Sequence, residues 1–444
     1  MRIYVINRLG KINQGGINLL NRLKTIKIGK KIKLHMIKTD KFKTNLVSVY
    51  FQRPLVKEEV TKNALLSMVL PRGTKSYISS KEISKALEGL YGAFIGCDVA
   101  KKGERNIIQF RMQLVNDKYV EDKEVFIKGM QILNEFIHDP YLVDGCFKKD
   151  YVDQEKENLI KKIEGRKNDK MKYSYERCIE EMCKNENYSL YEYGSIEDLK
   201  NISNESLYEH YKKIIHSTPI DICVVGDFDE KEMESLIAKK LNFKQEGVIS
   251  VEREKIECIP DDVKIIEDEM DINQGKLNLG YRTNIPFESE LYYPLLVYSN
   301  IFGGGPNSKL FKNVREKESL CYYIFSRVEK FKSLMLIGSG IEFNNYDKTV
   351  SLIKQQMEEM NSGNFSNEDI ESAKNSIITS IRSMTDSPYM LADFYFSQAI
   401  SNNEDTLDEM IKKIRTVDKE QIITAGKSIK LDTIYFLKGK GEVR

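Results

Sequence analysis

Hydrophobic and polar residues alternate along several short stretches of the chain, and this alternation predicts half-buried β-strands. The clearest examples are VSVYFQRP (residues 47–54) and KLNLGYRTN (residues 276–284). Alternation places successive side chains on opposite faces of a sheet. Each stretch precedes a segment predicted to be helical and then a turn that contains glycine, at Gly73 and at Gly303. The same order of elements is therefore expected twice.

A second matched pair lies further along each half of the chain. Residues 196–211 (IEDLKNISNESLYEHY) resemble residues 411–426 (IKKIRTVDKEQIITAG). In each segment an apolar pair is followed by a residue that favours the helix N-cap, Ser203 or Asp418. A helix is expected after each cap. These matches favour an internal duplication.

Further elements extend the repeat and indicate the fold class. The strand-like runs IDICVVGD and DTIYFLKG begin at Ile220 and Asp432, and the helical stretches 149–165 and 367–383 correspond. Each half thus runs strand, helix, strands, long helices, strand. This order predicts an α+β fold of two homologous domains, each a mostly antiparallel sheet with helices packed on one face.

The predicted boundaries follow from composition. A charged stretch with little periodicity, residues 246–262, is interpreted as a linker. It separates an N-terminal domain at 33–245 from a C-terminal domain at 263–444. Residues 1–32 contain lysine and arginine but no acid, and we interpret them as a solvated basic arm. A weak contact of this arm with an acidic partner or a membrane surface stays open.

The overall composition is that of a globular protein and excludes some classes of function. The chain has 444 residues, of which 41% are hydrophobic, and its 69 basic residues nearly balance 67 acidic ones. Whole-chain charge therefore gives no reason to expect a nucleic-acid partner. Seven scattered cysteines favour reduced thiols and a cytoplasmic location. No apolar run has the length that an integral membrane segment needs.

The most informative stretch is NALLSMVLPRGT, residues 63–74. It resembles a motif of the insulinase/pitrilysin family of zinc peptidases, which carries H-x-x-E-H on a helix that runs into a K/R-G-T turn. Zinc requires nitrogen, sulfur or oxygen ligands, and a hydrolytic zinc also needs a base for its water. The resemblance implies a peptidase frame without zinc or another cofactor, because both histidines and the glutamate are replaced. The five motif positions hold Ala64, Leu65, Leu66, Ser67 and Met68.

A third zinc ligand of the resembled family lies in a pattern like E-x-x-V-V-x-E-E-I. The corresponding stretch here is EKENLIKKI, residues 155–163. Glu155 matches the first glutamate, and Lys162 falls on the ligand position. An ammonium group cannot ligate a cation and repels it. The alternative interpretation is a solvated helix face, and both interpretations predict that no zinc is bound there.

A glycine cluster in the second half carries the closest match to the family. FGGGPNSKLFKNVREKESLCYY, residues 302–323, resembles the family pattern G-G-G-x-x-S-R-L-F-x-x-V-R-E-K-x-G-L-x-Y. As a phosphate-binding loop it lacks G-K-[ST]. By resemblance, the substrate-binding residues are Gly303, Gly304, Gly305, Arg315 and Tyr322.

The chemistry of Arg315 and Tyr322 suits a peptide, because a guanidinium and a phenol donate hydrogen bonds to backbone carbonyls. The alternative is that Arg315 pairs with Glu316 or Glu318 and that Tyr322 lies in the core. Ser319 stands where the family has glycine, which affects the expected turn.

These observations predict a catalytically inactive homologue of the insulinase family. The family's enzymes are clam-shell chambers of four homologous domains, so a chain of this length is expected to pair. The partner would be a homologous zinc-bearing subunit, in a heterodimer that binds peptide, or a second copy. Two alternatives stay open: a scaffold subunit without peptide recognition, and a zinc peptidase with unconventional ligands drawn from His35, His138, His210 and His216.

Overall fold

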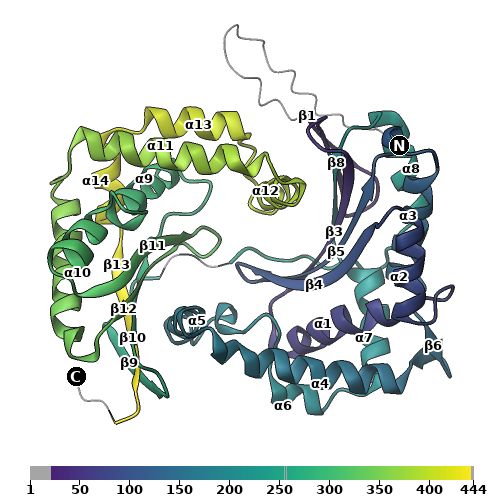
Figure 1. The fold of residues 1–444 in the computed structure, drawn as a ribbon, viewed down its shortest axis with the longest axis horizontal. Helices are drawn as coiled ribbons and strands as arrows, with labels where there is room; N and C mark the ends of the chain where they lie inside the picture. Colours follow the sequence, from purple (N-terminus) through teal and green to yellow (C-terminus); the bar gives the residue numbers. More distant parts are fainter. Residues whose placement is uncertain (1–21, 255, 257, 442–444) are drawn as a thin grey trace, which may run out of the picture. The chain divides into compact units, whose positions relative to one another are not determined.

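The computed structural model describes residues 22–254, 256 and 258–441 (Figure 1). The chain folds into two compact units, and each consists of segments that are not contiguous in sequence. Both units are α+β, with one main sheet each, which confirms the predicted fold class. Unit 1 comprises Met1–Glu164, Leu190–Arg253 and Met384–Ala399, and unit 2 comprises Gly165–Ser189, Glu254–Ser383 and Ile400–Arg444.

The sheet of unit 1 has six strands in the order β1-β2-β8-β3-β5-β4. All pairs are antiparallel except β2 with β8. The predicted strand at 47–54 is confirmed as part of β3. The strands are β1 (Arg22–Lys27), β2 (Ile32–Lys38), β3 (Thr44–Pro54), β4 (Phe94–Lys102), β5 (Arg105–Val115) and β8 (Ile220–Gly226), and a separate ribbon joins β6 (Leu142–Val143) to β7 (Cys146–Phe147).

Helices of unit 1 cover one face of this sheet and form its core with side chains such as Leu66, Phe110 and Leu133. The cap predicted at Ser203 is confirmed, because its hydroxyl accepts the amide of Ser206. The helices are α1 (Lys57–Val69), α2 (Ser80–Gly89), α3 (Val125–His138), α4 (Lys149–Gly165), α6 (Ile196–Lys200), α7 (Asn204–Ser217) and α8 (Glu230–Lys240), with 3₁₀ turns at η1 (Leu70–Arg72) and η2 (Asp117–Tyr119).

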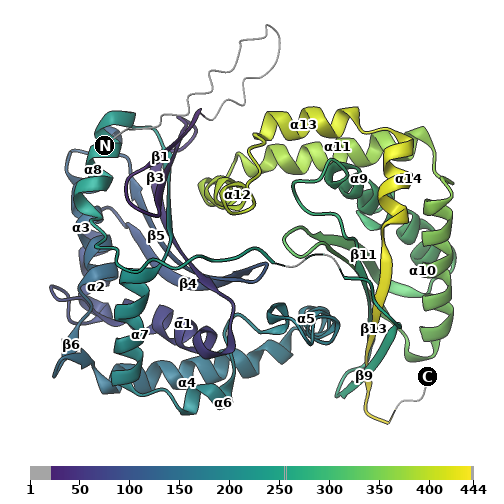
Figure 2. The ribbon, with the colours of Figure 1, turned by 180° about the vertical axis from the view of Figure 1, so that it is seen from behind.

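The sheet of unit 2 has five strands in the order β11-β12-β10-β13-β9. Only β13 and β9 run parallel. Figure 2 shows α10 and α14 along one face of this sheet. The strands are β9 (Lys264–Met270), β10 (Gly275–Arg282), β11 (Cys321–Glu329), β12 (Leu334–Ile341) and β13 (Lys430–Gly439).

The helices of unit 2 include the predicted stretch 367–383, which is confirmed as α11. Asp418 caps α14 by accepting the amide of Gln421, as expected. The helices are α9 (Tyr292–Gly303), α10 (Tyr346–Asn361), α11 (Asn367–Met384), α13 (Leu407–Thr416) and α14 (Lys419–Lys427), with a π-helix η5 (Phe311–Lys317) and 3₁₀ turns η3 (Arg166–Asn168), η4 (Asn187–Ser189) and η6 (Phe343–Asn345). No described helix is long and apolar enough to span a bilayer.

One helix of the first half, α5 (Lys170–Met182), belongs to unit 2 and packs on the second face of its sheet. Cys178 and Met182 are buried there against strands β12 and β13. Gly280 of β10 permits this approach, because a Cβ at that position would lie 2.8 Å from the sulfur of Met182. A larger residue would push the helix away from the sheet.

The reciprocal arrangement occurs in unit 1, where α12 (Pro388–Ile400) comes from the second half. The ring of Phe396 stacks on Tyr50 of β3, with centroids 4.0 Å apart and planes 7° apart. The sequence predicted helices on one face only, and these two helices cover the other face. Apart from the segments Gly165–Ser189 and Met384–Ala399, unit 1 ends at Arg253 and unit 2 begins at Glu254. Residues 1–21 of the predicted arm lie outside the described residues, and its later part includes β1.

Buried charges attach α5 to the sheet of unit 2. Arg282, which is 2% exposed, donates from Nε to Asp432 (3.0 Å) and from Nη2 to Glu186 (2.6 Å). Nη2 also donates to the carbonyl of Met182 at the end of α5 (3.0 Å). Lys332, which is also buried, forms an ion pair with the second oxygen of Glu186 (2.6 Å). The position of α5 on the sheet of unit 2 therefore depends on the guanidinium of Arg282.

We predict that Arg282→Ala destabilises unit 2 by about 3–5 kcal/mol, because it leaves the buried Asp432 carboxylate without its main cation. Urea unfolding followed by circular dichroism measures the loss. Lys149→Ala is the control, since the Lys149–Asp153 pair lies on the exposed surface, where solvent screening leaves an ion pair little effect on stability. Equal effects of the two substitutions would contradict the prediction.

A buried hydrogen-bond chain holds the middle of α1 in unit 1. Asn63 donates from Nδ2 to the side-chain oxygen of Asn106 (2.8 Å), so its own oxygen is free to accept. That oxygen lies 2.7 Å from Nε2 of His210, which must therefore carry the proton. Burial lowers the pKa of His210 to about 4, so the ring is neutral at pH 7.

The His210 pKa predicts acid sensitivity. Between pH 6.5 and 4 the unfolded histidine binds a proton that the folded one does not, so stability falls as the pH falls through this window, by at most about 3 kcal/mol. His210→Gln keeps a donor for Asn63 but does not titrate. We expect its unfolding free energy to decrease less than that of the wild type between pH 6.5 and 4. Parallel pH profiles would contradict the assignment.

Candidate functional site

The positions of the missing zinc motif lie on α1 and serve as packing residues. Ala64 is fully buried, and its carbonyl accepts a hydrogen bond from the hydroxyl of Ser67 (2.8 Å). Met68 is half-buried against the same core. The helix forms because no glycine or proline interrupts it before Pro71 and because Glu58 and Glu59 lie in its first turn. At positions 64–68 its side chains pack into the core, whereas the family motif has zinc ligands at these positions.

Lys162 on α4 is held by an aromatic ring and a carboxylate. Its Nζ lies 3.8 Å from the ring centroid of Tyr193 and 3.5 Å from Oδ1 of Asp98. The hydroxyl of Tyr193 donates to the same oxygen (2.9 Å). Burial and the Asp98 charge raise the pKa of Tyr193, so the phenol stays protonated. The predicted solvated face is therefore only partly correct, since the side chain is 40% exposed.

Glu155, the glutamate that the sequence retains, is also occupied. Arg72 of the R-G-T turn donates from Nη1 to Glu155 (2.8 Å), and Asn158 donates to its other oxygen (3.1 Å). The guanidinium also bonds Gln154 through Nη2 (2.6 Å). These contacts tie the turn after α1 to α4. Both oxygens of Glu155 are therefore engaged in hydrogen bonds within the fold.

The four histidines do not provide a replacement metal site. His35 bonds Asp221 (2.7 Å), and His210 bonds Asn63. The fold brings His138 near enough to His216 for the second ring to lower the pKa of the first, which burial reduces to about 4. Two imidazoles are fewer ligands than zinc takes in proteins. In the part of the chain that the structure describes, no three His, Cys, Asp or Glu side chains are grouped to hold a metal ion.

The glycine cluster lets the end of α9 approach strand β11. A Cβ on Gly303 would lie 2.7 Å from the backbone nitrogen of Ser326, and one on Gly304 would lie 2.5 Å from Asn300. Gly305 has φ +153°, a conformation that L side chains rarely adopt. The sequence placed these glycines in a substrate motif. Gly303 and Gly304 are closely packed, whereas a Cβ on Gly305 would meet nothing within 4 Å.

Arg315 lies on η5, which packs against β11. Its side chain is exposed, and its guanidinium carbon is 4.5 Å from the ring centroid of Phe311. Among the described residues it forms no ion pair, and Glu318 pairs instead with Lys348 (2.8 Å). The alternative that Arg315 is neutralised by Glu316 or Glu318 is therefore wrong. A π-helix is uncommon and often occurs at functional positions.

Tyr322 stands at a break in the pairing of β11. The register with β12 shifts between Cys321 and Tyr323, so Tyr322 is the extra residue of a bulge. It is 58% exposed, and its hydroxyl approaches Glu342 only at 3.4 Å. The alternative that Tyr322 lies in the core is wrong.

The turn before β11 keeps the shape that glycine would give, because Ser319 adopts a left-handed φ of +52°. Burial raises the pKa of Cys321 to about 11, and the Arg315 charge opposes this shift. Arg315 therefore lies close to Cys321. The fold brings Arg315 and Tyr322 to the same end of β11.

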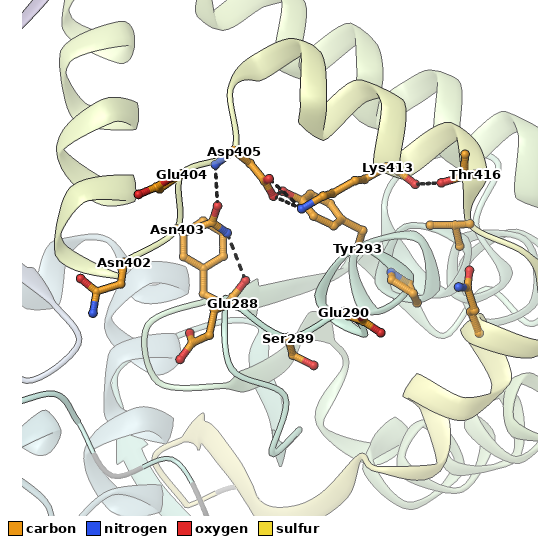
Figure 3. Close-up of a pocket in the computed structure, with 14 residues that line it drawn as sticks. Glu288, Ser289, Glu290, Tyr293, Asn402, Asn403, Glu404, Asp405, Lys413 and Thr416 are labelled. Atoms are coloured by element: carbon orange, nitrogen blue, oxygen red, sulfur yellow. Dashed lines mark hydrogen bonds and ion pairs between the residues drawn. The ribbon is translucent and has the colours of Figure 1, made fainter. Parts of the chain in front are cut away.

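A separate pocket of about 540 Å³ lies in unit 2 and contains none of the predicted site residues (Figure 3). Acidic groups line it, but Asp405 is bound by Lys413 (2.6 and 2.7 Å) and by the hydroxyl of Tyr293 (2.6 Å). Asn403 links the same loop to the carbonyl of Phe287 (3.4 Å). We interpret these contacts as structural, since they join the loop after α12 to α9 and α13.

Comparison with known proteins agrees with the motif. Residues 201–377 match the family model described as "Peptidase M16 inactive domain". The chain is 42% identical, over 91% of its length and 95% of the relative's, to a Bacillus subtilis (strain 168) protein named "Probable inactive metalloprotease YmfF". A second protein of that organism, "Uncharacterized zinc protease YmxG", is 23% identical over 34% of this chain and 37% of its own length.

Solved structures share the fold. A conserved protein from Enterococcus faecalis V583 superposes with a TM-score of 0.87 and 30% identity, over 95% of this chain and all of that chain. A peptidase M16 inactive domain from Pseudomonas fluorescens has a TM-score of 0.78 at 15% identity, over 94% of this chain and 98% of that one. Taken with the degenerate motif on α1, these matches establish that the chain belongs to the M16 (insulinase/pitrilysin) peptidase family, as an inactive homologue of its metalloproteases.

Proposed function

We propose that the chain is the non-catalytic subunit of a peptide-binding or peptide-processing complex and that a homologous, zinc-bearing M16 subunit is its partner. The observation that carries this proposal is the contrast between the two motifs. The positions on α1 are filled by buried apolar side chains, whereas Arg315 and Tyr322 remain exposed at one end of β11. Hydrolysis would then depend on the partner, and this chain would hold the peptide.

The exposure of Arg315 and Tyr322 supports a role in binding rather than in folding. An arginine without an ion pair adds little to stability, and a tyrosine that is 58% exposed buries little apolar area. Both side chains can donate hydrogen bonds to peptide carbonyls, which every peptide carries. Recognition through these groups would therefore tolerate many sequences.

A scaffold without peptide recognition is the second candidate. It is favoured by the local contacts of the pair, since the Arg315 guanidinium lies over Phe311 and the Tyr322 hydroxyl approaches Glu342. In a scaffold, these contacts within the chain would hold the two side chains in place, and no ligand would be involved. The two candidates predict different effects of substitution in the complex.

The first test concerns the metal. We expect the purified chain to contain well under one zinc per molecule and to keep its melting temperature when EDTA is added, because no ligand set is available on α1 and α4. Atomic emission and differential scanning fluorimetry measure these properties. Stoichiometric zinc together with chelator-sensitive peptidase activity would instead support unconventional ligands.

The second test uses a homologue from the same genome that retains H-x-x-E-H. We expect the two chains to form a complex in sedimentation velocity and to cleave quenched fluorescent peptides faster together than apart. Arg315→Ala should lower kcat/KM of the complex by about 10- to 100-fold, as expected for a lost charged hydrogen bond, and Tyr322→Phe by about 2- to 10-fold.

Matched controls are Arg415→Ala, an exposed arginine on α13, and Tyr119→Phe, a tyrosine that is 52% exposed in unit 1. Both should leave the rate and the association unchanged. If Arg315→Ala and Tyr322→Phe behave like these controls in an intact complex, the scaffold function is correct. If no complex and no change in activity are detected, the subunit proposal fails.

A further inference from the structure

Strand β11 continues beyond Tyr322 with two aromatic residues on one face. Ile324 and Ser326 point toward the helices, because the hydroxyl of Ser326 bonds Ser299 of α9 (2.8 Å) and Ile324 is buried. Tyr323 and Phe325 therefore point to the opposite face, where both are only half-buried. Their rings are stacked, with centroids 6.2 Å apart and planes 14° apart.

Two glycines in the neighbouring strand β12 allow these rings to lie flat on the sheet. A Cβ on Gly340 would come within 2.4 Å of the Tyr323 ring, and one on Gly338 within 2.5 Å of the Phe325 ring. Glycine inside a strand weakens it and often marks a close approach. We call Tyr323 and Phe325, lying over Gly338 and Gly340, the aromatic platform.

Two cations border the platform without a carboxylate partner. The Nζ of Lys276 lies 5.4 Å from the ring centroid of Tyr323, and the guanidinium carbon of Arg327 lies 4.9 Å from that of Phe325. Neither forms an ion pair within the described ranges of the chain. The charge of the Asp169 carboxylate acts on Lys276 and opposes the lowering of its pKa, but this carboxylate also accepts the amide of Lys172 as the cap of α5 (2.9 Å).

Lys276 is half-buried and Arg327 is exposed, and both differ from the arginines packed into unit 2, which have ion pairs. Arg282 pairs with Asp432 and Glu186, and Arg177 forms three ion pairs. Burial lowers the pKa of Lys276 despite the Asp169 charge, and its Nζ donates a hydrogen bond to the side-chain oxygen of Gln274. An acidic group of a ligand would supply the direct ion pair that Lys276 and Arg327 lack in the described part of the chain. Tyr175 of α5, 6.4 Å from Phe325, limits the platform on one side.

We propose that the aromatic platform is a side-chain subsite that selects peptides in which an aromatic residue is flanked by acidic residues. This inference rests on the proposed function, since Arg315 and Tyr322 would hold the peptide backbone beside it. Extended chains advance roughly 3.3 Å per residue. A peptide held at Tyr322 would place a side chain on Tyr323 and Phe325 within one or two residues, with its acidic neighbours beside Lys276 and Arg327.

Binding of three fluorescein-labelled peptides of equal length to the full chain tests the subsite. The peptides share one Gly/Ser background and differ only at their centres, which are Glu-Phe-Glu, Glu-Ala-Glu and Lys-Phe-Lys. Fluorescence anisotropy at low ionic strength gives each Kd. We expect Glu-Phe-Glu to bind about 3- to 10-fold more tightly than either of the other two peptides. This factor corresponds to the free energy of one aromatic stacking contact, or of one or two exposed ion pairs.

Substitutions in the platform should remove the preference and leave general binding intact. Phe325→Leu keeps apolar volume but removes the aromatic face, so we expect Glu-Phe-Glu to lose most of its advantage over Glu-Ala-Glu. Arg327→Gln should remove most of its advantage over Lys-Phe-Lys. Phe94→Leu, at a half-exposed phenylalanine of β4, and Arg415→Gln are controls that should change neither ratio. Circular dichroism verifies the fold of each variant.

The outcomes separate this inference from the proposed function. If the three peptides bind equally and Arg315→Ala abolishes binding of all of them, the platform is overturned and peptide recognition stands. If none of the three peptides binds at a concentration of about 1 mM, any binding free energy is weaker than about 4 kcal/mol. The platform and the proposed peptide recognition are then both overturned. A preference that persists in Phe325→Leu and Arg327→Gln would also overturn the platform.

Discussion

The fold depends on covering both faces of each sheet. Strand β8 of unit 1 and strand β12 of unit 2 are buried along their entire lengths, so neither sheet can leave a face in water. The helices of each half cover one face, and α12 or α5 from the other half covers part of the second. Because each unit takes a helix from the other half of the sequence, neither half contains all of its own core.

The degenerate motif follows the same requirement for burial. Unpaired imidazoles and a carboxylate are costly in a core unless a metal or hydrogen bonds compensate for their desolvation. Ala64, Leu65 and Leu66 are each at most 1% exposed, so apolar residues suit α1 once no metal is bound. Nearby polar groups are paired as well, since Lys162 lies between Asp98 and Tyr193. A helix that carries ligands in active relatives is here a structural element of the core.

Irregular backbone is concentrated around β11 rather than around α1. The π-helix η5, the left-handed Ser319 and the bulge at Tyr322 follow one another within about a dozen residues. Each departs from regular geometry, and such departures commonly occur where side chains must point at a ligand. Beyond the bulge, glycines in β12 allow Tyr323 and Phe325 to lie flat. The surface that the chain could offer to a peptide is therefore built on one edge strand.

Sequence alone determined the elements whose signals are local. Alternation located β3 and β10, the caps Ser203 and Asp418 began the expected helices, and the residues at 64–68 are not the histidines and glutamate of the family motif. Each of these features depends on residues close together in the chain, so each can be identified without knowledge of the fold.

Tertiary structure decided the rest, because those features depend on residues far apart. Periodicity reports that a helix has an apolar face, but it does not say which sheet receives that face, so the exchange of α5 and α12 was missed. The cation–π contact of Lys162, the proximity of His138 to His216 and the exposure of Tyr322 likewise arise from packing between distant segments. The sequence identifies Arg315 as a candidate, and only the fold leaves it without an ion pair in the described chain, where it can meet a ligand.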